Sequence, residues 1–268
     1  PKVPHQYYLF HVYYEYPDGD LSFHASSLNY SLIDMTGNNG LGTVIEKNQL
    51  ILADTLDHKI TTVKHANGTD IWVVTHGWEN TSFMAYLVTP TGIQTTPVIS
   101  TIGTIHEFPR NVGCLKASPD GTKMAIGLGL YAAELYDFDD GTGFLSNVQV
   151  LRNTPLDRYY GVEFSPNGQF VYVSTWNGLL FQYDITNANP ASTEQELFND
   201  PAVLIGTLQL GIDGKIYAAI AFENYINVIE NPNNAGLACN YIEQAIDLNG
   251  RESMIGLPPF IQSVFLVI

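Results

Sequence analysis

A unit of strand, tight turn and strand recurs along the second half of the chain at a nearly constant spacing. The three turn glycines are 47 and 46 residues apart: Gly121, Gly168 and Gly214. An acidic residue follows each glycine by 16 positions: Asp137, Asp184 and Glu230. A fixed offset inside a fixed period indicates a repeat architecture, and such a repeat restricts the fold more than any single motif does.

The turns themselves indicate β-hairpins. Ser118-Pro119-Asp120-Gly121 combines a proline that presets φ with a glycine that tolerates positive φ. Asn67-Gly68, between two β-like runs, is a strong hairpin signal of its own. No stretch of helical length shows a 3.6-residue apolar period, so an all-β fold is expected. Four short strands in each unit of 40–50 residues predict a β-propeller of four-stranded blades.

About five repeats are visible, and they predict a single propeller domain over residues 1–268. Their approximate bounds are 1–55, 56–104, 105–153, 154–206 and 207–268. The chain opens in the middle of a repeat, so the first blade should lack its inner strand. Further strands are expected at 7–14, 28–35, 40–53, 60–76 around the turn, 83–88, 97–103 and 145–151.

The sequence predicts a different structure for each of three later segments. Residues 187–200 are polar and should form a long loop or a single helical turn. Residues 234–252 should be irregular. Residues 256–268 are strongly apolar and should form a last strand, of the kind that closes a propeller by pairing with the other chain end.

Charge and composition restrict the partners. The formal net charge is -16, and only 11 residues are Lys or Arg, so nucleic acid and anionic membranes are poor partners. No apolar run is long enough to span a membrane. Few charges and many Tyr, Gly, Asn and Thr residues suit an extracytoplasmic β protein. No signal peptide is evident, so an exported chain would be a mature or excised piece.

An ordered series of motifs carries a family resemblance. It includes YYLFHV, KHANGTDIWVVTH, LKASPDGTKMA, YGVEFSPNGQFVYVST, LQLGIDGKIYAA and GLPPFIQSVF. The series resembles the WD-like or YVTN-like propeller region of large secreted Bacteroidetes surface proteins. The resemblance implies a C-terminal gliding-motility or type IX secretion sorting domain elsewhere in the protein. It also implies that this chain is the C-terminal part of a larger, seven-bladed propeller. It carries over no catalytic residues.

Carboxylates give one weak metal candidate. Asp137, Asp139 and Asp140 lie in an acidic, glycine-containing stretch that could bind calcium, although the full EF-hand spacing is missing. The alternative is an acidic hairpin loop whose carboxylates bind turn amides, and this alternative is favoured. No other cofactor is expected. Cys114 and Cys239 could pair in an oxidising compartment, but nothing in the sequence indicates a disulfide framework.

Aromatic residues near predicted loops give the ligand-binding candidates. His76, Trp78 and Glu79 cluster after one hairpin, and Trp176 and Tyr131 lie at the strand ends of later repeats. Tyr and Trp at a propeller face suit contacts with a peptide or a glycan. For the cluster of His76 and Glu79, ordinary packing at the end of a strand is the favoured alternative. For Trp78, Trp176 and Tyr131 the alternative is packing between blades.

The expected function is that of a non-enzymatic binding module at the outer cell surface or secreted from the cell. It would act in adhesion, gliding motility or surface assembly by recognising a protein or a glycan. Its other expected partners are the remaining domains of a larger surface protein or secretion assembly. The alternative is a propeller enzyme of lactonase or lyase type, with a metal in the central channel. That alternative requires Asp, Glu, Asn or His side chains that converge at the mouth of the channel. No nucleophile elbow or phosphate loop is present in the sequence.

Overall fold

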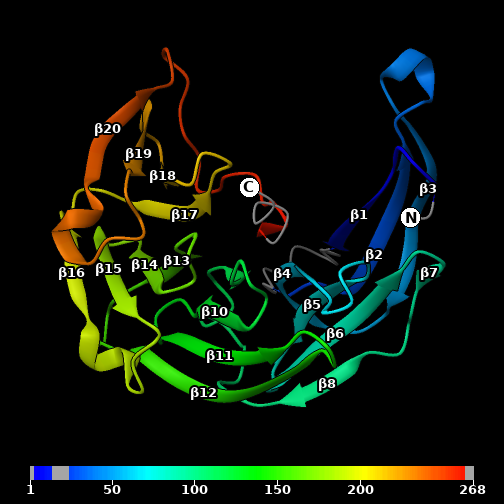
Figure 1. Cartoon of the computed structure of the whole chain (residues 1–268), viewed down its shortest axis with the longest axis horizontal. Coiled ribbons are helices and arrows are strands. Elements are labelled where there is room, and N and C mark those ends of the chain that lie inside the picture. Colours follow the sequence, from blue (N-terminus) through cyan, green and yellow to red (C-terminus); the bar gives the residue numbers. More distant parts are fainter. Residues whose placement is uncertain (1–2, 14–23, 263–268) are drawn as a thin grey trace. The chain divides into compact units, whose positions relative to one another are not determined.

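The computed structural model describes residues 3–13 and 24–262. These residues form β-strands β1 to β20 and three short 3-10 helices. The strands make five antiparallel sheets (Figure 1). The expected all-β class is therefore confirmed. None of the helices in the described part of the chain has the length and apolar character that a membrane crossing requires.

The chain divides into two compact units. Unit 1 contains Pro1–Asn111 and Asp139–Leu145, and unit 2 contains Val112–Phe138 and Ser146–Ile268. The hairpin tip in Asp139–Leu145 belongs to unit 1, where the backbone carbonyl of Asp140 accepts a 2.7 Å hydrogen bond from the Trp72 indole. The single-domain assignment from the repeats stays a prediction.

Unit 1 holds two sheets. Sheet A contains β1 (Gln6–Tyr13), β2 (Ser27–Asp34) and β3 (Thr43–Leu52). Sheet B contains β4 (Leu56–Lys64), β5 (Ile71–Gly77), β6 (Ser82–Thr89), β7 (Gly92–Ile93) and β8 (Val98–Thr101). Helix η2 (Asn38–Gly40) lies between β2 and β3. Among the described residues sheet A has three strands, the number expected for a first repeat without its inner strand.

Unit 2 holds the regular repeats. Sheet C contains β9 (Leu115–Ala117), β10 (Lys123–Gly127), β11 (Ala133–Asp139) and β12 (Phe144–Arg152). Sheet D contains β13 (Tyr159–Phe164), β14 (Phe170–Thr175), β15 (Leu179–Asp184) and β16 (Gln195–Asn199). Sheet E contains β17 (Ile205–Leu210), β18 (Ile216–Ile220), β19 (Tyr225–Ile229) and β20 (Tyr241–Asp247). Helix η3 (Pro190–Thr193) precedes β16, and helix η4 (Gly236–Cys239) precedes β20.

Within each unit the cores lie between consecutive sheets. Successive side chains of a strand point to opposite faces of its sheet, and middle strands such as β5 and β14 are buried along nearly their whole length, so both faces of these sheets are buried. One cluster joins sheets C and D around Phe164, Val173 and Tyr183. A second joins sheets D and E around Tyr172 and Leu208. In unit 1, sheet A packs on sheet B through Leu28, Leu56 and Tyr86.

Three strand predictions were wrong. In the segment expected to be a loop or a single helical turn, residues 190–193 form the helical turn η3. Residues 195–199 instead form β16, because an outermost strand needs only one hydrogen-bonded neighbour, and β15 supplies it. Residues 241–247 form β20 beside β19 for the same reason. Neither strand shows a clear alternation of apolar and polar residues, so the sequence pattern did not predict them. Residues 256–262 form no strand. Residue 14 and residues 263–268, which also belong to predicted strands, lie outside the described part.

After β20 the chain returns to the inner edge of sheet E. The amide of Thr207 in β17 donates to the carbonyl oxygen of Ile255 at 2.9 Å, and the amide of Leu257 donates to the Thr207 hydroxyl at 2.7 Å. A Cβ atom on Gly206 would lie 2.1 Å from that Ile255 oxygen. Only glycine permits this backbone approach.

We expect Gly206→Ala to destabilise the protein by about 2 kcal/mol or more, because overpacking forces the backbones apart and breaks the Thr207–Ile255 hydrogen bond. Urea unfolding followed by circular dichroism measures the change in midpoint. Gly256→Ala is the matched control, since a Cβ there meets no atom within 4 Å. Equal midpoints for the two variants would contradict the role given to Gly206.

Candidate functional site

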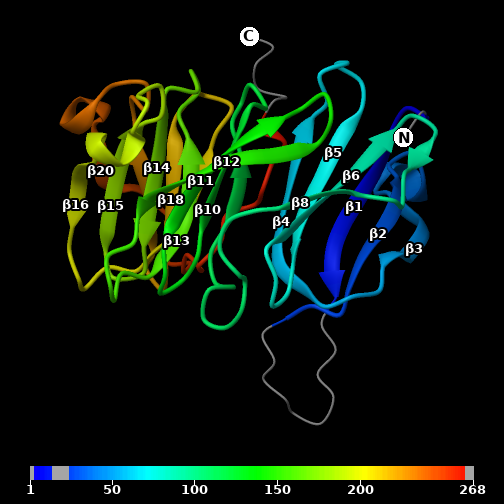
Figure 2. The ribbon, with the colours of Figure 1, turned by 90° about the horizontal axis from the view of Figure 1, so that it is seen from below.

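Six connecting segments lie at one end of unit 2. Strands alternate in direction within each sheet, so the loop after each second strand lies at the same end as the connector before each inner strand. Figure 2 shows the strands of unit 2 running between two layers of such segments. We define the loop end of unit 2 as residues 128–132, 153–158, 176–178, 200–204, 221–224 and 248–254.

Main-chain hydrogen bonds hold these segments together. Gly129 and Tyr159 exchange two backbone bonds, of 3.1 and 2.8 Å, so the β10–β11 loop is fixed to the start of β13. The amide of Trp176 donates to the carbonyl of Arg158 at 2.9 Å, which fixes the β14–β15 loop to the same strand. Loops of two neighbouring blades therefore flank the start of β13.

Two residues predicted from the sequence, Tyr131 and Trp176, lie in these two loops. Tyr131 is exposed in the β10–β11 loop, two positions after Gly129. Trp176 is half-buried, and its ring stacks on Tyr160 with centroids 4.7 Å apart and planes 25° apart. Its indole nitrogen is buried and has no hydrogen-bond partner among the described residues. Tyr160 lies in β13 and Trp176 directly follows β14, so this stack packs within sheet D and not between blades.

Exposed apolar side chains gather at the loop end. They are Leu130, Tyr131, Leu156, Leu204, Phe222 and Met254. Leu156 is 83% exposed with φ of 75°, and Phe222 is 58% exposed with φ of 68°. A bulky residue at positive φ is strained, and such strain concentrates at functional positions. At the opposite end of unit 2, Ile212 and Leu237 are exposed in turns of sheet E.

The other predicted ligand-binding residues lie in unit 1. His76 is fully buried at the end of β5. Trp78 and Glu79 follow in the β5–β6 loop, where the Trp78 ring lies 5.3 Å from the ring of His24. Glu79 is exposed, has φ of 55°, and its amide donates to the carbonyl of His106 at 2.7 Å. Of the residues that cluster in the sequence, His76 is thus packed in the core and Glu79 is exposed at the surface.

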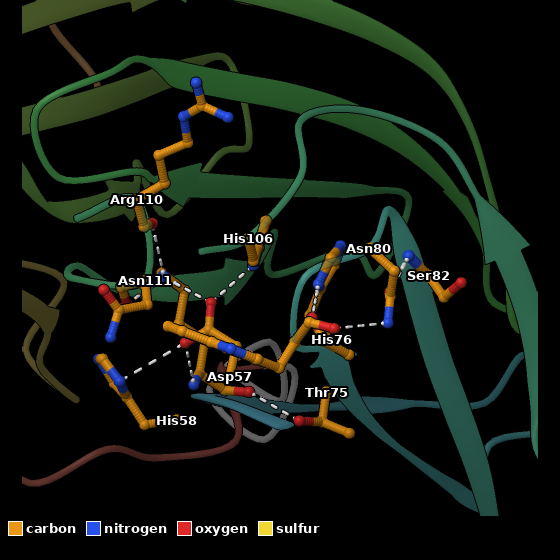
Figure 3. A network of polar contacts seen from close by, with 12 residues as sticks. Asp57, His58, Thr75, His76, Asn80, Ser82, His106, Arg110 and Asn111 are labelled. Atoms are coloured by element: carbon orange, nitrogen blue, oxygen red, sulfur yellow. Dashed lines mark hydrogen bonds and ion pairs between the residues drawn. The ribbon is translucent and has the colours of Figure 1, made fainter. Parts of the chain in front are cut away.

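His76 belongs to a buried polar cluster around Asp57 (Figure 3). Asp57 accepts from Nζ of Lys59 at 2.7 Å and pairs with Nδ1 of His106 at 2.6 Å. Lys59 also donates to the backbone carbonyls of Arg110 and Asn111. These bonds connect β4 to the segment after β8. Sequence reasoning missed Asp57 and His106, because they are 49 positions apart and belong to no motif.

The two histidines of this cluster are stacked face to face. Their ring centroids are 3.4 Å apart and their planes differ by 13°. Nδ1 of His76 contacts the carbonyl of Gly77 at 2.7 Å, so that nitrogen carries the proton. Neither Nε2 atom has a hydrogen-bond partner among the described residues.

Burial controls the protonation of this cluster. Burial, and then the neighbouring His106, lowers the pKa of His76 to about 2. Burial also lowers the pKa of His106 to about 4, although the bond to Asp57 opposes the shift. Burial alone would raise the pKa of Asp57, but Lys59 and His106 hold it well below its usual value. The cluster therefore pairs one carboxylate with one ammonium and keeps both imidazoles neutral.

Unit 2 has a buried polar cluster of its own. Lys116, Glu163 and Gln209 occupy equivalent positions on the inner strands β9, β13 and β17. Nζ of Lys116 donates to Gln209 at 2.6 Å and lies 3.4 Å from the Glu163 carboxylate. That carboxylate also accepts the amide of Leu210 at 3.0 Å and the side chain of Gln262. Glu163 is fully buried, so these bonds replace its lost water.

The acidic residues of the calcium candidate have protein partners. The carboxylate of Asp137 binds Lys123 and accepts from Asn147 at 3.0 Å. That of Asp139 accepts the amides of Gly141 and Thr142 at 2.9 and 3.1 Å. Asp140 contributes its carbonyl to Trp72 and Ala66. In the described part of the chain no three His, Cys, Asp or Glu residues are placed to hold a metal. Cys114 and Cys239 form no disulfide.

Comparison with known proteins identifies the fold. Neither a family model nor a curated protein matches the sequence. The β-propeller domain of a Myceliophteria thermophila protein superimposes with a TM-score of 0.50 at 11% identity, covering 87% of this chain and 66% of that one. A nidogen–laminin complex gives 0.49 at 14% identity over 85% and 75%. A luciferin-regenerating enzyme gives 0.44 at 14% identity over 73% and 66%. The predicted β-propeller fold is confirmed, and these identities carry nothing beyond the fold.

We expect the free energy of unfolding to fall as the pH is lowered from about 6.5 to 4. The unfolded chain takes up protons on His76 and His106 near their ordinary pKa, and the folded chain does not. Each histidine contributes up to about 1.4 kcal/mol per pH unit within its window. The stability contributed by the Asp57 carboxylate is lost only below about pH 4, because the pKa of Asp57 is lowered in the folded chain.

Denaturant unfolding at several pH values measures this slope. His76→Phe should make it shallower, because one proton-binding group is removed. His5→Gln is the matched control, since it removes an exposed histidine from the same unit. A slope unaffected by His76→Phe would count against this account.

Proposed function

We propose that the chain is a non-enzymatic binding module that recognises a protein partner through the loop end of unit 2. The observation that carries the proposal is the display of Leu156 and Phe222, bulky apolar residues held exposed at positive φ. Burying such side chains against a partner releases water from apolar surface, which is the main driving force of protein association.

A protein partner is favoured over a glycan by the chemistry of the exposed residues. Leu130, Leu156 and Met254 are aliphatic and suit apolar side chains of a partner. A glycan site would rely on aromatic faces combined with many polar groups. The Tyr160–Trp176 stack and Tyr131 add aromatic area of the kind that dominates binding energy at protein interfaces.

The net charge of -16 adds a preference for a neutral or basic partner, because like charge slows encounter and weakens association. The resemblance of the sequence motifs suggests the biological setting. We place the module in a large secreted Bacteroidetes-type surface protein, acting outside the cell in adhesion, gliding motility or surface assembly.

The enzyme alternative has less support from the side chains that could carry chemistry. Asp57, His76 and His106 are fully buried in unit 1, and Glu163 is fully buried in unit 2. Their polar atoms bind mainly other groups of the chain. A reaction would need such groups at an accessible surface.

The test is a selection of random displayed peptides on the immobilised full chain, followed by calorimetric titration of the selected peptides. The double variant Tyr131→Ala, Leu156→Ser should weaken binding about tenfold or more, since two exposed apolar contacts of about 1 kcal/mol each are lost. Quenching of Trp176 fluorescence by the bound peptide would place the ligand beside the stack.

Ile212→Ser, Leu237→Ser is the matched control, because it removes two exposed apolar side chains from the opposite end of unit 2. Its affinity should equal that of the unaltered chain. Equal weakening by both double variants would contradict the proposal. So would a glycan array that gives specific ligands while no peptide is selected.

A further inference from the structure

Strand β1 is an edge strand without the usual protection. It forms one edge of sheet A and pairs only with β2 among the described strands. Its eight residues, Gln6–Tyr13, contain no charged side chain apart from a titratable histidine, and no proline. Natural proteins protect long edge strands with lysine, proline or bulges, because an open edge templates pairing with another chain.

The direction of the backbone groups in β1 follows from two hydrogen bonds. The carbonyl of His5 accepts the Met35 amide at 2.9 Å, and that of Tyr13 accepts the Ser26 amide at 2.8 Å. Odd-numbered residues of β1 therefore bond β2, since the pattern alternates along an antiparallel strand. The N–H and C=O groups of Tyr8, Phe10 and Val12 point to the open edge.

The side chains of β1 also alternate. Tyr8, Phe10 and Val12 pack into the core between sheets A and B. Tyr7, Leu9 and Tyr13 lie on the other face and are 57%, 54% and 49% exposed. One row of cross-strand pairs, Tyr7–Ile33–Val44, extends this apolar face to β3, where Val44 is 52% exposed. Leu50 of β3, 59% exposed, pairs with the polar Asn29.

Other long edge strands of the described chain are charged or covered. Strands β3, β12, β16 and β20 contain Asp, Glu, Lys or Arg, and so does β13. Strand β17 is uncharged, and there the extended segment 253–257 bonds its edge through Thr207. An uncharged inner edge in this protein is thus covered by an extended stretch of chain. In sheets C, D and E an inner strand lies beside β10, β14 and β18. In sheet A no described strand takes the equivalent place, which is the open edge of β1.

We propose that β1 is a strand-addition site, which accepts an extended, uncharged segment of a protein partner as the fourth strand of sheet A. The added strand runs antiparallel to β1 and bonds the main chain of Tyr8, Phe10 and Val12. Alternate apolar side chains of the partner then lie beside Tyr7 and Leu9 on the exposed face. The site is in unit 1 and is independent of the loop end of unit 2.

The test is amide hydrogen exchange of the full chain by NMR, with a synthetic peptide of the sequence of residues 204–211 as the probe. In the free chain the amides of Tyr8, Phe10 and Val12 should exchange fast, while those of Leu9 and His11 are protected by β2. Addition of the peptide should slow the three edge amides about tenfold or more, because each gains a hydrogen bond. Edge amides already as protected as Leu9 in the free chain would overturn the proposal.

Two controls separate strand addition from other binding. A peptide N-methylated at alternate residues on its pairing edge should protect nothing, since it lacks the donors. Leu9→Lys should weaken the unmodified peptide about tenfold, whereas Leu50→Lys, equally exposed on the same face but on β3, should not. Equal effects of the two lysine variants would show docking on the face of sheet A instead, and would also overturn the proposal.

Discussion

The close approach of backbones at the inner strands of unit 2 is the constraint on which its architecture depends. A Cβ on Gly161 would lie 2.5 Å from the carbonyl of Gly206, and a Cβ on Gly206 would lie 2.1 Å from that of Ile255. Inner strands that approach this closely leave room for only short polar links, such as the Ser174 hydroxyl that joins Gly161 to Gly206. The apolar area needed for stability must then come from the broad faces between sheets, and the clusters around Phe164 and Tyr172 supply it.

Each unit also encloses charged groups, and both use the same physical solution. Asp57 faces Lys59 in unit 1, and Glu163 faces Lys116 in unit 2, with neutral side chains completing the hydrogen bonds. Removing one partner would leave a buried charge uncompensated, which costs far more than the pair contributes. These clusters therefore specify how inner strands and connectors fit together, while the apolar side chains available to partners lie at loops and at one strand edge.

The sequence predicted the parts of the fold that repeat. Turn glycines and strand alternation located the first three strands of most blades and the incomplete first blade. Outer strands such as β16 and β20 were missed because an exposed edge needs little apolar pattern. Of the candidate site, Tyr131 and Trp176 were found as loop aromatics, but Leu156 and Phe222 were not. The importance of these two depends on backbone conformation, which leaves no local sequence signal.

The hydrogen bonds at the loop end run between main-chain atoms at Gly129 and Tyr159, and at Trp176 and Arg158. Bonds of this kind do not depend on which side chains the loops carry. Loop residues such as Leu130 and Tyr131 can therefore be exchanged with little effect on the sheets beneath. The propeller is in this sense a scaffold. Its binding specificity can change through loop substitutions, by natural divergence or in a designed library of loop variants, without a change in its core.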